Sequence, residues 1–236
     1  MPTVLITGAN RGLGLEFSRQ YAADGWGVFA TARVPEKGEE LRRLAAQYSK
    51  LSLHTLDITS EESVQGLVDA LDGKPLDVLI LNSGIYPREG QTIGQIDYEG
   101  WREAFETNVL GTIRMSEALL ENVAASERKQ IAAISTSLSS LRGVQGSSVT
   151  QAGTSYQYRT TKTALNMAMS ILAKEVAPRG IRVVIFDPGW VKTDMGGAHA
   201  QLTPQQSISG MRKVLAGNAM EISGKFLGHD GTLRPW

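Results

Sequence analysis

The chain has 236 residues, with 24 lysines and arginines against 24 aspartates and glutamates, and no cysteine. This length suits one large α/β domain or two small ones. The balanced charge creates no overall field that would attract nucleic acid or a membrane surface, so we expect neither as a partner. The lack of cysteine excludes disulfides, thiol nucleophiles and zinc–thiolate sites. It also fits a reducing compartment, so we expect a cytoplasmic protein.

The sequence also lacks targeting, membrane and metal signals. It opens directly on a strand-like run, so we expect no signal peptide. The longest uncharged apolar-rich run, 163–173, is too short to span a bilayer. The histidines His54, His199 and His229 show no metal-ligand spacing, so we expect no metal site. No G-x-S-x-G elbow occurs, which argues against a serine hydrolase.

The first motif is a strand, a glycine-rich loop and a helix. Residues 4–6 are β-rich, residues 7–14 contain three glycines, and residues 15–23 have helical apolar spacing. Gly8 allows a tight turn, Gly12 lets backbone approach a pyrophosphate, and Gly14 allows close packing of helix on strand. The helix N-terminus then offers N–H groups to phosphate. The spacing is G-x-x-x-G-x-G rather than G-x-G-x-x-G, but its position predicts dinucleotide binding.

The second strand, 27–32, indicates which dinucleotide binds. In a Rossmann unit, an acidic residue at the end of this strand binds the ribose 2′-hydroxyl, whereas an arginine accommodates a 2′-phosphate. Here the strand ends at Arg33, and the next acidic residue is Glu36. Arg11 in the glycine loop adds a second positive charge. We therefore expect NADP(H) in preference to NAD(H).

Strands and helices alternate along most of the chain. We expect further strands at 51–56, 76–81, 131–134 and 181–186, and helices at 39–48, 101–120 and around Tyr158 as far as Val176. Another helix starts at Thr59 or Ser60 and continues to Leu71, and the serine- and glycine-rich segment 135–155 is expected to be a loop. The alternation predicts an α/β, single-domain Rossmann fold over residues 1–236, with a doubly wound, mostly parallel sheet and helices on both faces.

Tyr158 and Lys162 stand four residues apart in the expected helix, which places both side chains on one helical face. A phenol needs help to act as an acid or base near neutral pH, because its ordinary pKa is about 10. An ammonium group one turn away favours the phenolate and so lowers this pKa. The spacing alone is weak, since a surface tyrosine and a solvated lysine often share it by chance.

These motifs together resemble the short-chain dehydrogenase/reductase family. The matching residues run in the family's order over nearly the whole chain: Thr7, Gly8, Gly12, Gly14, Asp57, Asn82, Gly84, Asn108, the cluster Ser135-Thr136-Ser137, Tyr158, Lys162, Pro188 and Gly189. Within the family, the segments 188–197, 202–204 and 226–236 resemble the C-factor and Sniffer-like carbonyl reductase branch. One member of that branch is associated with cell-to-cell signalling in bacteria.

The resemblance implies a mechanism. Tyr158 would donate a proton to a carbonyl oxygen as hydride arrives from the nicotinamide, and Lys162 would lower the tyrosine pKa and bind the nicotinamide ribose. A hydroxyl from Thr136 or Ser137 would hydrogen-bond the substrate oxygen. Asn108 would hold a water that relays protons to Lys162. These five residues are the implied catalytic set.

The resemblance also implies the cofactor contacts. Asp57 would meet the adenine amino group, with Ile58 beside the ring, and Thr193 would contact the nicotinamide carboxamide. Simpler structural roles stay open for Asn108 as a helix-kink residue and for Asp57 and Thr193 as helix caps. The full implied cofactor set is Gly8, Asn10, Arg11, Gly12, Leu13, Gly14, Arg33, Asp57, Ile58, Asn82, Ser83, Gly84, Tyr158, Lys162, Pro188, Gly189, Val191 and Thr193.

Two departures from the family pattern leave questions open. The position of the family's serine is Thr136 here, and threonine keeps the hydroxyl but restricts χ1, so either Thr136 or Ser137 is the substrate-orienting residue. The segment between Thr136 and Tyr158 is also longer than usual. It either lines the substrate mouth or alters a subunit contact.

The sequence therefore predicts an NADPH-dependent oxidoreductase whose small-molecule substrate is a carbonyl compound: an aldehyde, ketone or quinone. One alternative is an NADP(H)-binding signalling or sensor protein with little turnover, and the retained Tyr158 and Lys162 count against it. Another is an oxidative dehydrogenase that uses NAD, and the lack of an acid at the end of the second strand counts against that. We also expect a homo-oligomer, either a dimer or a tetramer.

Overall fold

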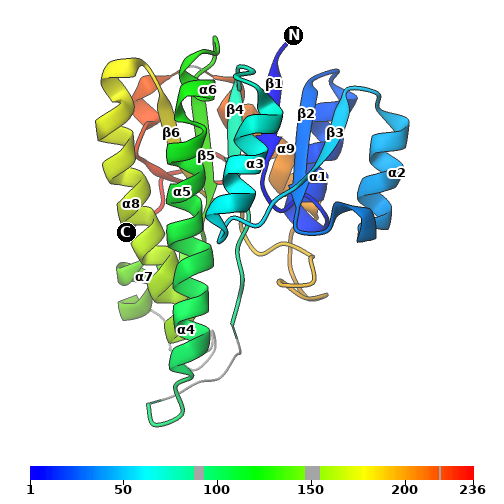
Figure 1. Ribbon diagram of the computed structural model, residues 1–236. Helices are drawn as coiled ribbons and strands as arrows, with labels where there is room; N and C mark the ends of the chain where they lie inside the picture. Colours follow the sequence, from blue (N-terminus) through cyan, green and yellow to red (C-terminus); the bar gives the residue numbers. More distant parts are fainter. Residues whose placement is uncertain (88–92, 147–154, 218) are drawn as a thin grey trace.

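The computed structural model describes residues 1–87, 93–146, 155–217 and 219–236, and its strands form a single seven-stranded sheet (Figure 1). The strand order is β3-β2-β1-β4-β5-β6-β7, and all neighbouring strands are parallel. The predicted Rossmann architecture is confirmed. The strands are β1 (Thr3–Ile6), β2 (Gly27–Ala32), β3 (Leu51–Thr55), β4 (Val78–Leu81), β5 (Gln130–Ile134), β6 (Arg182–Asp187) and β7 (Phe226–Gly228).

Helices cover both faces of this sheet, as Figure 1 shows. On one face the strands pack against α1 (Gly12–Ala23), α2 (Glu39–Gln47) and α9 (Pro204–Ala216). On the other they pack against α3 (Glu61–Leu71), α5 (Gly111–Ala118), α6 (Leu120–Ala124) and α8 (Tyr156–Val176). Successive strand residues alternate between the two cores, so Val4 and Ile6 face α1 while Leu5 faces the opposite layer. Burial on both faces explains why these strands are continuous apolar runs.

The strand order reverses at β1, which lies between β2 and β4. The chain leaves β1 towards α1 on one face, whereas the elements that follow β4 pack on the other. Such a divergence opens a crevice at the carboxyl ends of the strands, where ligands bind in open α/β sheets. In Figure 1 the helix α4 (Tyr98–Phe105) extends beyond this edge, towards the bottom of the view.

Most predicted elements are present with shifted ends. The helix α1 begins at Gly12, inside the glycine loop, and β4 begins at Val78 rather than at residue 76. The choice left open for α3 falls on Ser60, whose hydroxyl accepts a hydrogen bond from the backbone N–H of Ser63 at 3.2 Å. This contact satisfies one of the free donors in the first turn of the helix.

The predicted helix 101–120 is not continuous. A π-helical turn at Glu106–Leu110 separates α4 from α5, and it contains Asn108. The expected loop at 135–155 is wrong for Leu141–Gly146, which form the helix α7, while 147–154 lie outside the described residues. The helix α9 and the strand β7 were not predicted. A capping box between Thr203 and Gln206 starts α9 and was a readable signal for it.

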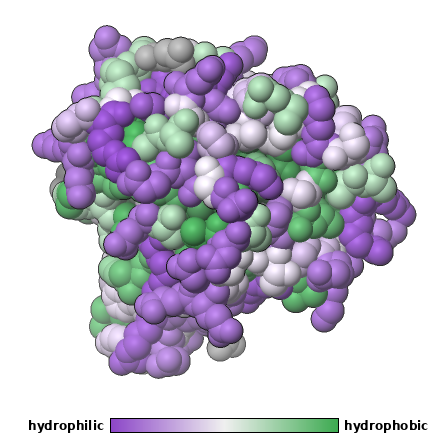
Figure 2. Space-filling model, turned by 45° about the horizontal axis from the view of Figure 1, so that its top comes forward, coloured by the Kyte–Doolittle hydropathy of each residue, from purple (hydrophilic) through white to green (hydrophobic). Residues whose placement is uncertain are grey.

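The surface seen in Figure 2 is mostly hydrophilic, with apolar residues in separate patches between the polar ones. Within the described parts of the chain, no helix combines the length and apolar character that a membrane crossing needs.

The packing at Gly14 generates a stability prediction. A Cβ added there would lie 2.1 Å from the carbonyl oxygen of Gly8, whereas one added at Gly66 on the exposed side of α3 would meet nothing within 4 Å. Gly14→Ala should therefore lower the free energy of unfolding by roughly 1–3 kcal/mol or more. Gly66→Ala should leave it unchanged or raise it by up to about 1 kcal/mol, because alanine favours the helix. Urea unfolding of both variants measures the difference, and equal effects would contradict the packing argument.

Candidate active site

The glycine loop between β1 and α1 is built for close backbone approach. Gly8 has a φ of +68°, a left-handed conformation that favours glycine, and the first turn of α1 touches its carbonyl oxygen at Gly14. No side chain caps α1 at Arg11, and its first turn has no acidic residue. The N–H groups of this turn are therefore left for an anion, which fits a dinucleotide pyrophosphate.

Thr7 and Asn82 join this loop to the end of β4. The Thr7 hydroxyl accepts hydrogen bonds from the backbone N–H groups of Asn82 (2.9 Å) and Ser83 (3.0 Å). The Asn82 side-chain amide donates to the carbonyl oxygens of Thr7 (2.9 Å) and Gly8 (3.1 Å). Asn82, expected along the cofactor, thus holds the glycine loop in place. Thr7 was predicted only as part of the family motif, and its role in joining the two loops was not foreseen, although it stands at the start of the glycine loop.

The end of β2 and the end of β3 meet at the same edge. Hydrogen bonds from the Thr59 hydroxyl (2.7 Å) and backbone N–H (2.9 Å) lower the pKa of the Asp57 carboxyl, and the nearby Arg33 charge lowers it further. Arg33 is exposed. Arg11 instead pairs with Asp194 on the loop after β6, at 3.0 Å, with both side chains exposed. Arg33 and Asp57 are therefore close to each other, whereas the positive charge of Arg11 is paired with the carboxylate of Asp194.

Three further predicted cofactor residues lie around this edge in different surroundings. Asn10 is exposed at the tip of the glycine loop, and Leu13 packs against the core beneath α1. Ile58 is buried, and its side chain lies so close to Gly111 that a Cβ there would be 2.8 Å from Ile58 Cγ1. Ile58 therefore packs α5 against the end of β3.

Tyr158 and Lys162 both lie in the first turns of α8, as predicted, and both are buried. The α8 N-cap is Ser155, whose hydroxyl accepts from the Tyr158 backbone N–H at 3.3 Å. Lys162 Nζ donates to the carbonyl oxygen of Ile134 at 2.8 Å and lies 5.9 Å from the centre of the Tyr158 ring. Burial lowers the pKa of Lys162 to about 8.

The surroundings of Tyr158 differ from the expectation. Its ring centre lies 4.5 Å from that of Tyr86, and its hydroxyl is 4.0 Å from the sulfur of Met195. Burial, followed by the nearby Tyr86 and Asp187, raises the pKa of Tyr158 above its ordinary value. The predicted lowering by Lys162 is not found. The lysine ammonium is directed at the Ile134 carbonyl, and burial of the phenol is the largest cause of its raised pKa.

Asn108 lies in the π-helical turn and is fully buried. Its Oδ1 accepts from the Ile85 backbone N–H (2.8 Å), and its Nδ2 donates to the Ile85 carbonyl (3.0 Å) and to the Thr161 hydroxyl (3.1 Å). A Cβ added at Gly84 would be 3.1 Å from Asn108 Oδ1 and 3.3 Å from Lys162 Nζ. The missing side chain at Gly84 therefore leaves room for the side-chain ends of Asn108 and Lys162 beside the Gly84 backbone.

The hydroxyl loop, residues 135–140, follows β5 on the other side of Lys162. Ser135 is buried, and its hydroxyl has no hydrogen-bond partner among the described residues. The Thr136 hydroxyl is half-buried and accepts from the Leu138 backbone N–H at 3.2 Å, which leaves its own proton for another acceptor. Ser137 is exposed, and its backbone N–H donates to Asp187 Oδ1 at 3.0 Å.

The loop after β6 faces the glycine loop. A Cβ added at Gly12 would be 3.5 Å from Thr193 Cγ2, so the two loops approach each other across the crevice. The Thr193 hydroxyl accepts from the Gly196 backbone N–H at 3.1 Å. The remaining predicted residues, Pro188, Gly189 and Val191, belong to the same loop. The Pro188 carbonyl accepts a hydrogen bond from Ser207 Oγ at 2.7 Å, and Gly189 has a φ of +76°. Val191 is buried and forms a β-bridge with Leu202.

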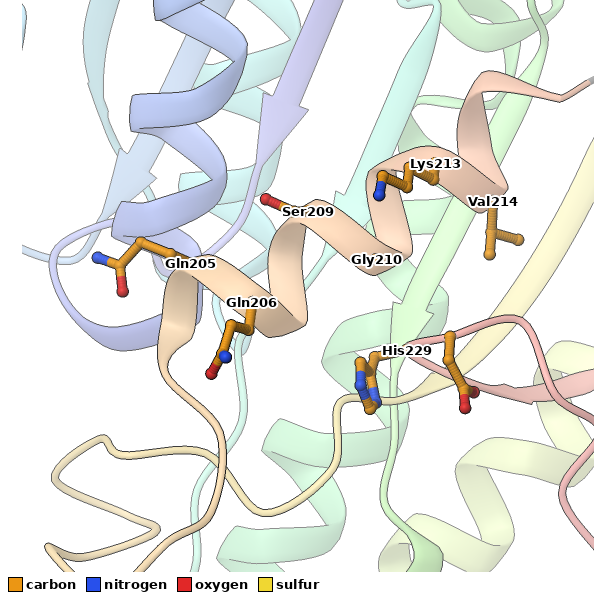
Figure 3. Close-up of a pocket in the computed structure, with 8 residues that line it drawn as sticks. Gln205, Gln206, Ser209, Gly210, Lys213, Val214 and His229 are labelled. Atoms are coloured by element: carbon orange, nitrogen blue, oxygen red, sulfur yellow. The ribbon is translucent and has the colours of Figure 1, made fainter.

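An open groove of about 750 Å³ lies elsewhere, along α9. Figure 3 shows its lining side chains on α9 and at His229, which follows β7. None of the predicted catalytic residues lines this groove. The residues that line it are Gln205, Gln206, Ser209, Gly210, Lys213, Val214, His229 and Asp230.

The glycine loop, Asn108, the hydroxyl loop, Tyr158 and Lys162 thus lie along the same carboxyl edge of the sheet. The sequence pattern of the family described as short chain dehydrogenase matches residues 2–202. This chain belongs to the short-chain dehydrogenase family.

Individual relatives agree with this assignment. The C-signal of Myxococcus xanthus is 35% identical over 164 residues, which cover 69% of this chain and 93% of that protein. The NADPH-bound carbonyl reductase from chicken fatty liver superposes with a TM-score of 0.92 at 32% identity, covering 100% of this chain and 99% of that one. The carbonyl reductase Sniffer of D. melanogaster superposes with a TM-score of 0.90 at 30% identity, covering 100% of both chains. The predicted likeness to the C-factor and Sniffer-like branch is confirmed, and the chain is an oxidoreductase of this family.

Several site residues of this dehydrogenase were not foreseen. Tyr86 and Met195 contact Tyr158, and Asp187 binds the hydroxyl loop. Each stands near a recognised motif, because Tyr86 follows Gly84 and Asp187 precedes Pro188. Their sequence positions were therefore a signal, but which way their side chains point depends on the fold.

Burial of Lys162 makes stability depend on pH. Its pKa is about 8 in the folded protein against an ordinary 10.5, so the unfolded chain binds more protons between these values. The contribution of Lys162 to the free energy of unfolding therefore rises by up to about 3 kcal/mol across this window, is complete above it, and is lost as pH falls through 8. Urea unfolding of wild type and Lys162→Met should show a difference that grows across the window, because methionine does not titrate.

The control for this measurement is Lys174→Met, which changes an exposed lysine on the same helix. It should differ from wild type by a constant amount over the same pH range. A constant difference for Lys162→Met as well would contradict the lowered pKa.

Proposed function

We propose that the protein is an NADPH-dependent reductase of small carbonyl compounds, with Tyr158 as the proton donor. The observation that carries this proposal is the convergence of Tyr158, Lys162 and Asn108 beside a glycine loop at the carboxyl edge of the sheet. Carbonyl reduction needs a hydride and a proton delivered to one bond from fixed positions, and this edge offers a binding loop and a buried phenol together.

The residues around the crevice fit a nicotinamide dinucleotide. The free N–H groups of the first turn of α1 would take the pyrophosphate, and Asp57 with Arg33 would take the adenosine end. Thr193 would lie at the nicotinamide end, because its loop faces Gly12. When bound, the cofactor supplies the hydride.

The chain's own side chains then manage the proton. The raised pKa of Tyr158 keeps the phenol protonated, so it can donate its hydrogen to a carbonyl oxygen. Thr136 is the better-placed second donor, since its oxygen already accepts from Leu138 and its proton is left for the substrate, while Ser137 is exposed. Lys162, whose pKa is about 8 and whose Nζ lies 5.9 Å from the centre of the Tyr158 ring, would act as the nearby positive charge that stabilises the phenolate left after proton transfer. Asn108, which uses both its side-chain atoms on Ile85 and Thr161, holds α4–α5 against α8.

NADP(H) is the proposed cofactor in preference to NAD(H). Arg33 is exposed at the end of β2, and its charge acts on the neighbouring Asp57, so it stands where a 2′-phosphate would lie. The chicken carbonyl reductase is described with NADPH bound, and a short-chain dehydrogenase/reductase from Burkholderia multivorans is described with NADP bound. Both are similar to this chain.

A second function is supported by the likeness to the C-signal of Myxococcus xanthus. A signalling role would need cofactor binding with little turnover, and the buried Tyr158–Lys162 pair favours turnover instead. The cytoplasmic location, the single domain over 1–236 and the dimer or tetramer stay predictions.

Tyr158→Phe tests the proton donor. The change removes only the hydroxyl, so NADPH affinity should be unchanged while kcat falls by roughly 100-fold or more, as expected for loss of a general acid. The assay is purified protein with NADPH against a panel of aldehydes, ketones and quinones. Tyr156→Phe, two residues earlier on the same helix, is the control and should keep wild-type turnover. Undiminished turnover in Tyr158→Phe would remove Tyr158 from the role, and no wild-type turnover with tight cofactor binding would favour the signalling function.

Arg33→Ala tests the cofactor preference. Loss of a charged contact to the 2′-phosphate should weaken NADPH binding by roughly tenfold or more and leave NADH binding nearly unchanged. Cofactor fluorescence titration measures both dissociation constants. The matched control is Arg179→Ala, because Arg179 pairs with Glu121 just before β6, at the opposite edge of the sheet. Equal losses for both cofactors in Arg33→Ala would mean that the 2′-phosphate is bound elsewhere.

A further inference from the structure

Asp187, the last residue of β6, joins two loops of the proposed site. It is 3% exposed, and its Oδ1 accepts from the backbone N–H groups of Ser137 (3.0 Å) and Gly189 (3.3 Å). Ser137 belongs to the hydroxyl loop and Gly189 to the loop after β6. One buried carboxylate therefore sets the spacing between these two loops.

The charge of Asp187 is compensated from the end of the chain. Arg234 Nε lies 3.2 Å from Asp187 Oδ2, and the carboxylate side chain is 4% exposed. The Nε–H group is not aligned with this oxygen, so the contact is an ion pair without a hydrogen bond. Among the described residues, Asp187 forms a salt bridge with Arg234 and with no other side chain. A buried carboxylate is strongly unfavourable without a counter-charge, so Arg234 stabilises the ionised Asp187.

The C-terminal tail, residues 233–236, holds Arg234 in this position. The Arg234 backbone N–H donates to the Phe226 carbonyl at 2.8 Å, and the Trp236 ring stacks on Phe226 with centres 5.6 Å apart. The Trp236 backbone oxygen accepts from Ser140 Oγ and from the Arg142 backbone N–H, both at 3.1 Å. Figure 1 shows the C-terminus beside α8 and above α7. The tail thus contacts the hydroxyl loop directly at Ser140 and, through Asp187, at Ser137.

We propose that Arg234 is a positioning residue: through Asp187, it holds the hydroxyl loop in place opposite Tyr158. The inference rests on the proposed reductase function and adds to it a role for the C-terminal tail. The tail reaches no reacting atom. It acts by fixing the backbone that presents Thr136 and Ser137.

Arg234 also affects the charge around Tyr158. Among the described residues, the charged and titratable groups that face Tyr158 are Lys162 on its own helix, Tyr86 after β4, and Asp187 on β6. Burial raises the pKa of Tyr158 most, and Tyr86 and Asp187 add to the rise. Because Arg234 screens Asp187, its removal should raise the pKa of Tyr158 further, whereas removal of the Asp187 charge should lower it.

The test compares Arg234→Gln, Arg234→Lys, Asp187→Asn and the double variant Arg234→Gln/Asp187→Asn. Lysine keeps the charge, and asparagine keeps an oxygen that accepts from Ser137 and Gly189. The control is Lys225→Gln, an exposed lysine just before β7. Two quantities are measured: hydrogen–deuterium exchange of the Ser137 amide in protein without added cofactor, and kcat for carbonyl reduction, with its rescue by Arg234→Lys and by the double variant.

In Arg234→Gln the Ser137 amide should exchange roughly tenfold faster, because the carboxylate that protects it is no longer held. Its kcat should fall by roughly tenfold, as expected when a positioned group is displaced, with NADPH affinity unchanged. Asp187→Asn should keep the Ser137 amide protected and kcat near the wild-type value, because asparagine keeps the accepting oxygen and needs no counter-charge. The double variant should follow Asp187→Asn, because the residue at position 187 then carries no charge for Arg234 to balance. Arg234→Lys and Lys225→Gln should resemble wild type.

An unchanged Ser137 exchange rate in Arg234→Gln overturns the proposal, as does an equal loss of kcat in Arg234→Gln, Arg234→Lys and the double variant. Such an equal loss is what a merely structural role for the tail would give. If the wild-type protein reduces no carbonyl, the proposed function fails, but the exchange measurement still decides whether Arg234 holds the loop.

Discussion

The single direction of all seven strands is the constraint on which the site depends. Because the pairs are parallel, the loops after β1, β2, β3, β4, β5 and β6 all leave from one edge. Residues distant in sequence therefore meet there, with Ser83 against Gly8 and Thr193 against Gly12. The close backbone contact between Gly14 and Gly8 keeps α1 aimed at this edge, and it tolerates no side chain.

Buried polar groups join the backbone segments at this edge. Lys162 binds the Ile134 carbonyl, Asn108 binds both backbone groups of Ile85, and Asp187 binds Ser137 and Gly189. Each would be costly to bury alone, and each is satisfied by the backbone of a neighbouring loop. The same side chains that suit acid–base chemistry are therefore also the ones that hold the loops together.

The motif residues were predictable because their types and spacing carry the chemistry directly. The Tyr158–Lys162 pair follows from helical geometry, and the glycine loop from its place between a strand and a helix. Asn82 was correctly placed at the end of β4, but its amide holds the glycine loop. The sequence could not show this, because the oxygens it binds belong to Thr7 and Gly8, which follow β1 and are distant along the chain.

The parallel α/β fold, the order of the motifs and the family can be read from the amino-acid sequence alone, since these depend on local periodicity and on residue types at fixed spacing. The environment of each group depends on the tertiary structure. Tyr86 and Met195 enclose Tyr158, burial raises the pKa of Tyr158 rather than letting Lys162 lower it, and Arg234 pairs with Asp187. The reason is physical: solvation and ion pairing depend on which distant segments exclude water from a group, and no local pattern encodes those neighbours.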